Sequence, residues 1–193
     1  DELISKSLTV SIKVKTDFYA DLWPVRIDSG DLEDAILNLS LNAKDAMPEG
    51  GNLVIESSNK TLDEGYVALN PESSSGEFVM ISVSDDGIGM TDDVRDKVLE
   101  PFFTTKVQGK GTGLGLSMVY GFVQRSGGHI KIYSELGKGT TFHIFIPRAK
   151  EEDQTVDAKE YTLSGLPRGT ETILVVDDEE DLVELASEYL KYL

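Results

Sequence analysis

Four glycines stand at every second position from Gly109 to Gly115, and the sequence turns helical directly after them. Apolar residues follow from Leu116 to Val123 at the spacing of one helix face. Ordered glycine is costly in backbone entropy, so four of them before a helix need a reason. Unpaired N–H groups and the positive end of the dipole make a helix start suited to an anion. A flexible linker is the alternative interpretation.

Two common phosphate loops are excluded by spacing. A P-loop needs a Gly-Lys pair followed by Ser or Thr, whereas both Gly-Lys pairs, at residues 109–110 and 137–138, precede another Gly. The dinucleotide fingerprint G-x-G-x-x-G follows a buried parallel strand, but this repeat is G-x-G-x-G after the irregular stretch EPFFTTKVQ. The kind of anion site must therefore be inferred from the rest of the chain.

Composition excludes several function classes. The chain is 39% hydrophobic and 27% charged, as in a soluble globular protein, and no apolar run approaches the roughly 20 residues of a membrane span. Zero Cys removes disulfides and thiol chemistry and suits a reducing cytoplasm. The net charge of −17 argues against nucleic-acid binding. We expect a cytoplasmic segment without direct membrane contact, whose parent protein could be membrane-anchored.

The distribution of charge divides the chain. Residues 149–193 carry 13 of the 35 acidic side chains but only 4 of the 18 basic ones, so they hold more than half of the net charge. We predict one domain over 1–148, an acidic linker over 149–170, and the truncated start of a second domain over 171–193. In that last segment a buried-strand run precedes an acidic cluster and an amphipathic helix.

The first domain has an α+β pattern. Asp31 can cap a first helix, which Pro48 and two glycines end. A further helix starts at Leu114. The other predicted elements are strands at 8–16, 52–59, 77–85, 129–136 and 140–148, a short acidic helix at 91–99, and a polar loop before residue 77. This order predicts a two-layer α/β sandwich, with a mostly antiparallel sheet and helices on one face.

Three polar residues share one face of the first predicted helix. Asn38, Asn42 and Asp45 lie four and three residues apart. Asn is a poor helix former, so two of them in mid-helix need compensation. A solvated polar face is one interpretation. The other is a row of oxygen ligands, in which neutral amides suit a hydrated Mg²⁺ that already carries phosphates.

A second polar group ends the strand at 77–85. Asp85 and Asp86 precede Gly87 and Gly89 in the stretch DDGIGM. A hairpin turn is one interpretation. In the other, a carboxylate at the end of a buried strand accepts a hydrogen bond from an exocyclic amine, and the glycines let the backbone close on a flat ring.

Four motifs, NLSLNAKDAMPEGG, DDGIGM, PFFTTK and GKGTGLGLS, carry a family resemblance. They stand in the order of the N, G1, F and G2 boxes of bacterial sensor histidine kinases. They resemble in particular hybrid kinases, whose catalytic domain belongs to the superfamily shared with gyrase, Hsp90 and MutL. The match covers about residues 20–148 and implies a Bergerat-type ATP-binding fold. The later ILVVDDE resembles the start of a response-regulator receiver domain, in which Asp177 and Asp178 would be the Mg²⁺-binding pair.

The resemblance implies roles for single residues. Asp85 would bind the adenine amino group, Asn42 would coordinate Mg²⁺ together with ATP, and Asn38 would be the catalytic residue near the γ-phosphate. The glycines from Gly109 to Gly115 would form the hinge of a lid over the triphosphate. The residues implied to bind ATP are Asn38, Asn42, Asp45, Asp85, Gly87, Gly89, Met90, Phe102, Thr105, Lys106, Gly109, Lys110, Gly111, Thr112, Gly113, Leu114, Gly115 and Leu116.

The lid has neighbours with implied roles of their own. Thr105 and Lys106 would hold phosphates and position the lid, while Phe102 and Phe103 would pack it down. Asp86 replaces the commoner Asn of the G1 box and adds negative charge near a triphosphate. Many sensor kinases have a basic residue in place of Asp45, so phosphate neutralisation would rest on Mg²⁺ and nearby lysines.

Asn38 separates members of the superfamily. Gyrase-type ATPases and anti-sigma-factor kinases usually have Glu there, as a base for water or a serine hydroxyl. An amide cannot take that proton, and a His nucleophile with an unprotonated nitrogen does not need it. The resemblance therefore implies a protein-histidine kinase catalytic domain that transfers the γ-phosphoryl of ATP to a His on a separate dimerisation domain. A gyrase-like ATPase and a non-catalytic nucleotide-binding or docking module are the alternatives.

Neither resident histidine suits phosphoacceptance. His129 and His143 both fall in strand patterns, away from the helical, acidic context of an acceptor. We expect the chain alone to be unable to phosphorylate itself. The expected partners are the His-bearing dimerisation domain and a downstream receiver domain or response regulator.

Overall fold

The computed structural model describes residues 12–70, 73–106 and 111–149, together with Leu174. The chain divides into two units, 1–149 and 150–193, and the fold described below belongs to the first. The predicted linker and second domain, with Asp177 and Asp178, lie outside the described residues apart from Leu174. They remain predictions.

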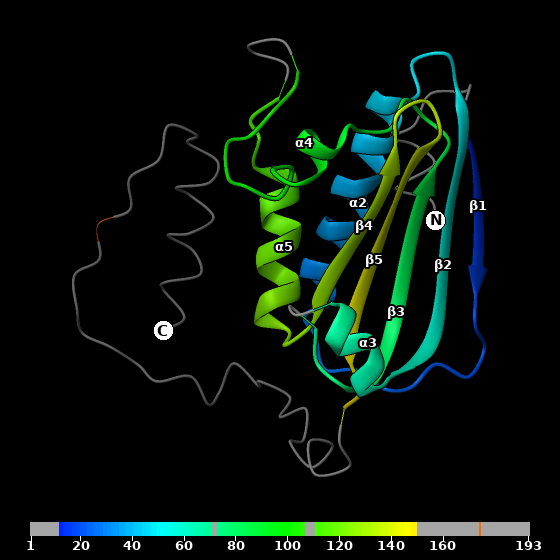
Figure 1. The fold of residues 1–193 in the computed structure, drawn as a ribbon, viewed down its shortest axis with the longest axis vertical. Helices are drawn as coiled ribbons and strands as arrows, with labels where there is room; N and C mark the ends of the chain where they lie inside the picture. Colours follow the sequence, from blue (N-terminus) through cyan, green and yellow to red (C-terminus); the bar gives the residue numbers. More distant parts are fainter. Residues whose placement is uncertain (1–11, 71–72, 107–110, 150–173, 175–193) are drawn as a thin grey trace. The chain divides into compact units, whose positions relative to one another are not determined.

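A five-stranded sheet forms one layer of the first unit (Figure 1). The strands run in the order β1 (Ile12–Phe18), β2 (Gly51–Leu62), β3 (Gly76–Asp85), β5 (Gly139–Pro147) and β4 (His129–Glu135). All neighbours pair antiparallel except β1 and β2, which are parallel. The parallel pair is possible because the longest helix lies between these strands in sequence and forms the crossover.

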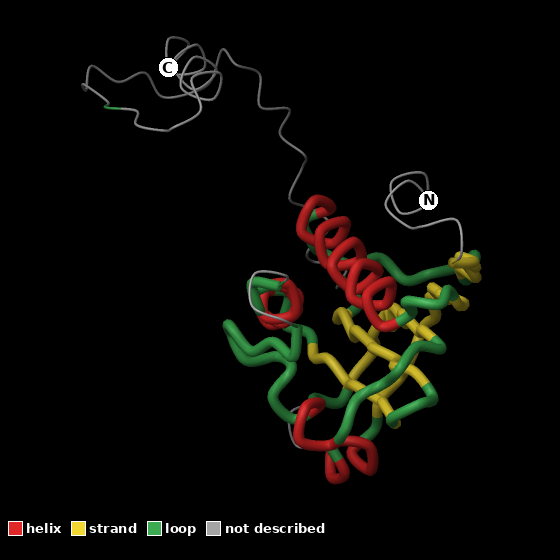
Figure 2. Tube along the Cα trace, turned by 90° about the horizontal axis from the view of Figure 1, so that it is seen from above, coloured by secondary structure: helices red, strands yellow, loops and turns green. Residues whose placement is uncertain are grey.

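Two helices, α2 (Ser29–Ala46) and α5 (Gly115–Arg125), cover one face of the sheet, and Figure 2 shows this second layer from above. The apolar stripe of α2 buries Ala35, Leu39 and Ala43, and α5 buries Val119, Phe122 and Val123. They pack on inward side chains of the sheet, among them Leu53, Val83, Ile144 and Ile146. The predicted two-layer α+β sandwich with a mostly antiparallel sheet is therefore confirmed.

The start of α2 differs from the prediction. Asp28, not Asp31, is the cap: its carboxylate accepts hydrogen bonds from the N–H groups of Gly30 and Asp31, at 2.8 and 3.1 Å. Asp31 lies in the first turn, where its carboxylate favours the helix dipole and pairs with Arg125 of α5 at 2.9 Å. The prediction was wrong because both aspartates fit the cap pattern and periodicity does not choose between them.

Two short helices also depart from the prediction. The acidic helix α4 spans only Asp92–Arg95. Helix α3 (Glu64–Leu69) was not predicted, although Asp63 caps it through the N–H of Tyr66 at 2.8 Å. Tyr66 packs on a small apolar cluster with Phe78 and Phe145, which alternate with the main-core residues along β3 and β5. Helix α3 therefore lies on the face of the sheet opposite α2 and α5. No helix in the described part of the chain is long and apolar enough to cross a membrane.

Candidate functional site

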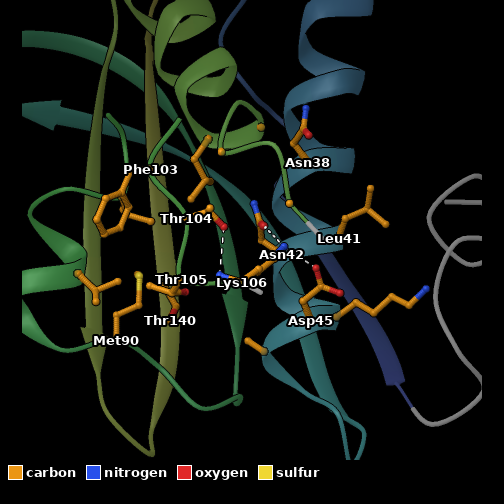
Figure 3. Close-up of a pocket in the computed structure, with 18 of the residues that line it drawn as sticks. Asn38, Leu41, Asn42, Asp45, Met90, Phe103, Thr104, Thr105, Lys106 and Thr140 are labelled. Atoms are coloured by element: carbon orange, nitrogen blue, oxygen red, sulfur yellow. Dashed lines mark hydrogen bonds and ion pairs between the residues drawn. The ribbon is translucent and has the colours of Figure 1, made fainter. Parts of the chain in front are cut away.

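A cavity of about 570 Å³ opens between α2, the start of α5, the end of β3 and the segment at residues 103–106 (Figure 3). Most of the predicted site residues line it: Asn38, Asn42, Asp45, Asp85, Gly89, Met90, Thr105, Lys106, Gly111, Thr112, Gly113, Gly115 and Leu116. The fold thus brings together motifs that are up to about eighty residues apart in sequence. Phe103, expected to pack the lid, also lines the cavity.

Some predicted residues do not line the cavity. Gly87, Phe102 and Leu114 are outside its lining, and Gly109 and Lys110 lie outside the described residues. Sequence reasoning missed a further set: Leu41, Lys44, Ala46, Ile88, Val94, Val98, Thr104, Thr140 and Phe142. The spacing of Val94 and Val98 was an available signal, since it gives an apolar pair on one face of the predicted helix 91–99, although Val98 lies beyond the end of α4. No local sequence pattern pointed to Thr140, because it lies at the site only as the β5 residue that pairs with Asp85 of β3.

Asp85 ends β3 at the inner side of the cavity. Its carboxylate accepts a hydrogen bond from the N–H of Gly87 at 2.9 Å. Burial raises the pKa of Asp85 above its usual value of 3.8, while hydrogen bonds from the backbone of Gly87 and Thr140 act in the opposite direction. The arrangement is a desolvated acceptor held in a fixed orientation.

The neighbouring Asp86 has a different environment. Its two carboxylate oxygens accept hydrogen bonds from the backbone N–H of Asn52 at 2.8 Å and the Asn52 side-chain amide at 2.6 Å. These bonds lower the pKa of Asp86. Asp86 does not line the cavity, so the carboxylate that replaces the commoner Asn is engaged with the start of β2.

The loop after Asp85 packs tightly against the β4–β5 hairpin. Gly89 has a positive φ of 64°, and a β-carbon there would collide with the carbonyl of Glu135. The carbonyl of Ile88 accepts a hydrogen bond from Gly137 at 2.7 Å. Glycine at position 89 is therefore required by both its conformation and the close approach of the hairpin.

The segment before α5 is held by its backbone. Phe102 N donates to Gly113 O at 2.9 Å, and both residues have φ of 67°. A β-carbon on Gly113 would collide with the backbone of Phe102. Phe102 is 74% exposed, and the lid residues 107–110 lie outside the described residues, so the expectation that its ring packs the lid down stays a prediction. The backbone of Phe102, rather than its ring, makes the contact with Gly113.

The first turn of α5 faces Asn38 of α2. Leu114 precedes the helix, and no side chain caps its N-terminus, while Gly113, Gly115 and Leu116 line the cavity. A β-carbon on Gly115 would lie 2.9 Å from Asn38 Oδ1, and Asn38 Nδ2 donates to Asp34 O at 2.9 Å. The uncapped helix start beside a neutral amide is a suitable place for an anion.

A lysine reaches across the cavity to the polar face of α2. Lys106 Nζ lies 2.5 Å from Asp45 Oδ2 and 3.2 Å from Asn42 Oδ1, as the dashed lines in Figure 3 show. The described residues contain no group of three or more His, Cys, Asp or Glu that could hold a metal ion. A metal here would need ligands from a bound molecule as well as the amide oxygens.

The residues that line the cavity fall within a match to a known protein family. Residues 27–150 match the model of the histidine kinase-, DNA gyrase B- and HSP90-like ATPases. The chain belongs to this ATPase family. Its Asn38, Asn42, Asp85 and glycine-rich helix start all fall within the matched residues.

Curated relatives of this ATPase-family chain are sensor and sporulation kinases. It is 44% identical over 184 residues to sensor kinase CckA of Brucella abortus, across 92% of this chain and 20% of the relative. It is 35% identical to sporulation kinase E of Bacillus subtilis, across 81% of this chain and 19% of the relative. The chain thus spans about a fifth of the length of these relatives.

Solved structures agree on the fold. The catalytic domain of histidine kinase ThkA superposes with a TM-score of 0.56 at 27% identity, across 77% of this chain and 86% of that one. Full-length ShkA in complex with AMPPNP superposes with a TM-score of 0.59 at 29% identity, across 77% of this chain and 28% of that one. This chain therefore has the ATP-binding catalytic fold of the histidine kinase family.

Proposed function

We propose that this chain contains the catalytic domain of a cytoplasmic sensor histidine kinase, which transfers the γ-phosphoryl of ATP to a His on a separate dimerisation domain. From there the phosphoryl group would pass to a receiver domain or response regulator. The observation that carries the proposal is Asn38, a neutral amide beside the open N-terminus of α5.

The adenine end of the site is Asp85. A carboxylate held by backbone N–H groups in a partly desolvated cavity accepts from an exocyclic amine and repels a carbonyl. Met90 and Phe103 supply apolar cavity wall for a flat ring. Asp85 therefore favours adenine over guanine.

The phosphate end is the start of α5 with Thr105 and Lys106. The glycines leave the N–H groups of this turn accessible to phosphate oxygens. The amide oxygen of Asn42 would hold Mg²⁺ that arrives with the nucleotide, and the ion would neutralise phosphate charge. Oxygen-only ligands of this kind are the ones that Mg²⁺ prefers in proteins.

The chemistry assigned to Asn38 is positioning. An amide does not take a proton from water or from a serine hydroxyl. The acceptor is therefore a nucleophile that is already unprotonated, as one imidazole nitrogen is at neutral pH. This reasoning disfavours a gyrase-like hydrolase.

The resident histidines are unsuited to be that acceptor. His129 is only 6% exposed and stacks on Phe145 with ring centroids 4.4 Å apart, and His143 lies in β5 against Tyr133. Phosphorylation of His129 would require its buried ring to leave the aromatic cluster. The chain alone would then bind ATP without labelling itself.

Two measurements test the proposal. Calorimetric titration should show Mg-ATP binding, which Asn42→Ala weakens far more than it weakens binding of metal-free adenosine. Radiolabelled ATP should label the parent's dimerisation domain when that domain is supplied, and should leave this chain unlabelled. Rapid hydrolysis without a His substrate would favour the gyrase-like ATPase, and no ATP binding would favour a docking module.

A further inference from the structure

The hydroxyl of Ser134 lies behind the wall of the cavity. Ser134, on β4, does not line the cavity, but its neighbours Met90 and Thr140 do. Met90 N donates to Ser134 Oγ at 2.8 Å. Ser134 Oγ also lies 3.0 Å from Gly139 O and 3.0 Å from Thr140 Oγ1. One half-buried hydroxyl thus joins the loop after β3 to the β4–β5 hairpin.

These contacts fix the direction of each hydrogen bond. A hydroxyl has one proton and two lone pairs. The carbonyl of Gly139 can only accept, so it receives the Ser134 proton. The two lone pairs of Ser134 then accept from Met90 N–H and from the Thr140 hydroxyl. In this arrangement the Thr140 proton is directed to Ser134, and the lone pairs of Thr140 Oγ1 remain as acceptors.

Thr140 stands directly beside the candidate base site. It is paired with Asp85 in the β3–β5 register, its backbone hydrogen bonds to the Asp85 carboxylate, and it is only 6% exposed. The cavity wall therefore presents two acceptors from adjacent strands, the carboxylate of Asp85 and the hydroxyl oxygen of Thr140. Such a wall favours a ligand edge that donates and disfavours one that carries a carbonyl.

We propose that Ser134 is a positioning residue that sets base specificity, because it holds the Thr140 hydroxyl as an acceptor. The inference rests on the proposed function, since it places a purine base against Asp85. Without the Ser134 hydroxyl, Thr140 is free to rotate and donate into the cavity. A base with a carbonyl in place of the amino group then gains a partner, and adenine loses its advantage.

The test compares Mg-ATP with Mg-ITP, whose base has a carbonyl where adenine has the amino group. The parent protein is expected to bind ATP more tightly than ITP. Ser134→Ala should lower the ratio of the two affinities about three- to tenfold, the effect of one net hydrogen bond. Ser134→Thr keeps a hydroxyl and should restore the ratio. Thr140→Val removes the acceptor itself and should lower the ratio at least as much as Ser134→Ala.

Ser84→Ala is the matched control. Ser84 and Thr141 form a hydroxyl pair of 2.9 Å between β3 and β5, but neither residue lines the cavity. Its loss should leave the ATP-to-ITP ratio unchanged.

The outcomes separate this inference from the proposed function. Equal weakening of ATP and ITP by Ser134→Ala, or no change in either, would show that Ser134 serves only the fold. A fall in the ratio for Ser84→Ala would also overturn the assignment. A parent protein that binds neither nucleotide would overturn the proposed function, and this inference with it.

Discussion

Lys106 and Asp45 form an ion pair of 2.5 Å across the cavity, although they are 61 residues apart in sequence. The same ammonium group donates to Asn42 Oδ1, the atom proposed to hold Mg²⁺. In this structure Lys106 therefore uses the oxygen that is proposed to bind Mg²⁺, and the carboxylate of Asp45 neutralises its positive charge. In the proposed binding mode, Mg-ATP would redirect Lys106 from Asp45 to phosphate oxygens.

Asp45→Asn is expected to strengthen Mg-ATP binding about two- to fivefold at low salt. The change removes a negative charge beside the phosphates and releases Lys106. The effect is small because the pair is partly exposed, and such pairs contribute about 0.2–1 kcal/mol. Calorimetric titrations at low and high salt provide the measurement, and the gain should shrink as salt screens the charges.

Asp31→Asn is the control for this substitution. Asp31 is also an ion-paired carboxylate of α2, with Arg125 as partner, but it lines only a smaller groove between α2 and α5. It should leave Mg-ATP affinity unchanged. Weaker binding by Asp45→Asn would show instead that the Asp45 carboxylate itself holds the ion or the nucleotide.

Gly113→Ala should reduce Mg-ATP affinity more than tenfold. The new methyl group would collide with the backbone of Phe102 and displace the segment that closes the cavity. Gly137→Ala is the control. It has the general cost of a left-handed conformation at a non-glycine residue, about 1–2 kcal/mol, without a collision. Gly137 has φ of 80° and nothing within 4 Å of its added β-carbon. Equal loss of affinity in the two variants would contradict the importance of the Phe102–Gly113 contact.

Substitution of the adjacent carboxylates Asp85 and Asp86 by Asn should change stability in opposite directions. Burial raises the pKa of Asp85, so its stabilising contribution is present below the usual pKa and is lost as pH rises through the folded-state pKa. Asp85→Asn should therefore raise the thermal midpoint of the ligand-free protein at pH 7, while ATP affinity falls about tenfold or more.

Asp86→Asn provides the contrast. Hydrogen bonds from Asn52 lower the pKa of Asp86, so its contribution is present above the usual pKa of 3.8 and is lost as pH falls through the folded-state pKa. This variant should lower the thermal midpoint at pH 7 and retain ATP binding. Both variants shifting the midpoint in the same direction would contradict the two environments described for these residues.

The aromatic cluster around His129 should make the fold sensitive to mild acid. Burial lowers the pKa of His129, with a smaller contribution from Lys131, and Nε2 of this imidazole has no hydrogen-bond partner. A lowered pKa means that stability is present above the usual value of about 6.5 and is lost as pH falls through the folded-state pKa. Urea denaturation between pH 7.5 and 5 should show that the free energy of unfolding falls as pH falls. The variant His129→Phe should make this pH dependence less steep. If the free energy of unfolding of His129→Phe depends on pH as steeply as that of the parent protein, the acid sensitivity comes from other groups.

Local sequence patterns were sufficient to predict much of this fold and of the candidate site. The spacing of Asn38 and Asn42 placed them correctly on one helix face, and the glycines before Leu116 were correctly placed at a helix start. These features depend on backbone periods and on the conformational range of glycine, which the sequence shows directly.

Contacts between distant segments could not be predicted in the same way. The pairing of Lys106 with Asp45, and of Ser134 with Met90, depends on how the loops fold over the sheet. The backbone contact of Phe102 with Gly113 was not predicted, because nothing in the local sequence indicates that Phe102 has a positive φ. Helix α3 was missed because Asp63 is a cap signal that stands in a polar stretch without helical period.

The hydrogen bond from Phe102 N to Gly113 O holds two backbone positions together, so the chain between them is bounded at both ends by one contact. The entropy of closing a flexible loop grows only with the logarithm of its length, so each doubling costs about 0.6 kcal/mol. Insertions between these two residues would therefore cost the sheet and its helices little. We therefore expect a change of chain length between Phe102 and Gly113 to alter nucleotide access and exchange more than the stability of the fold that supports the cavity.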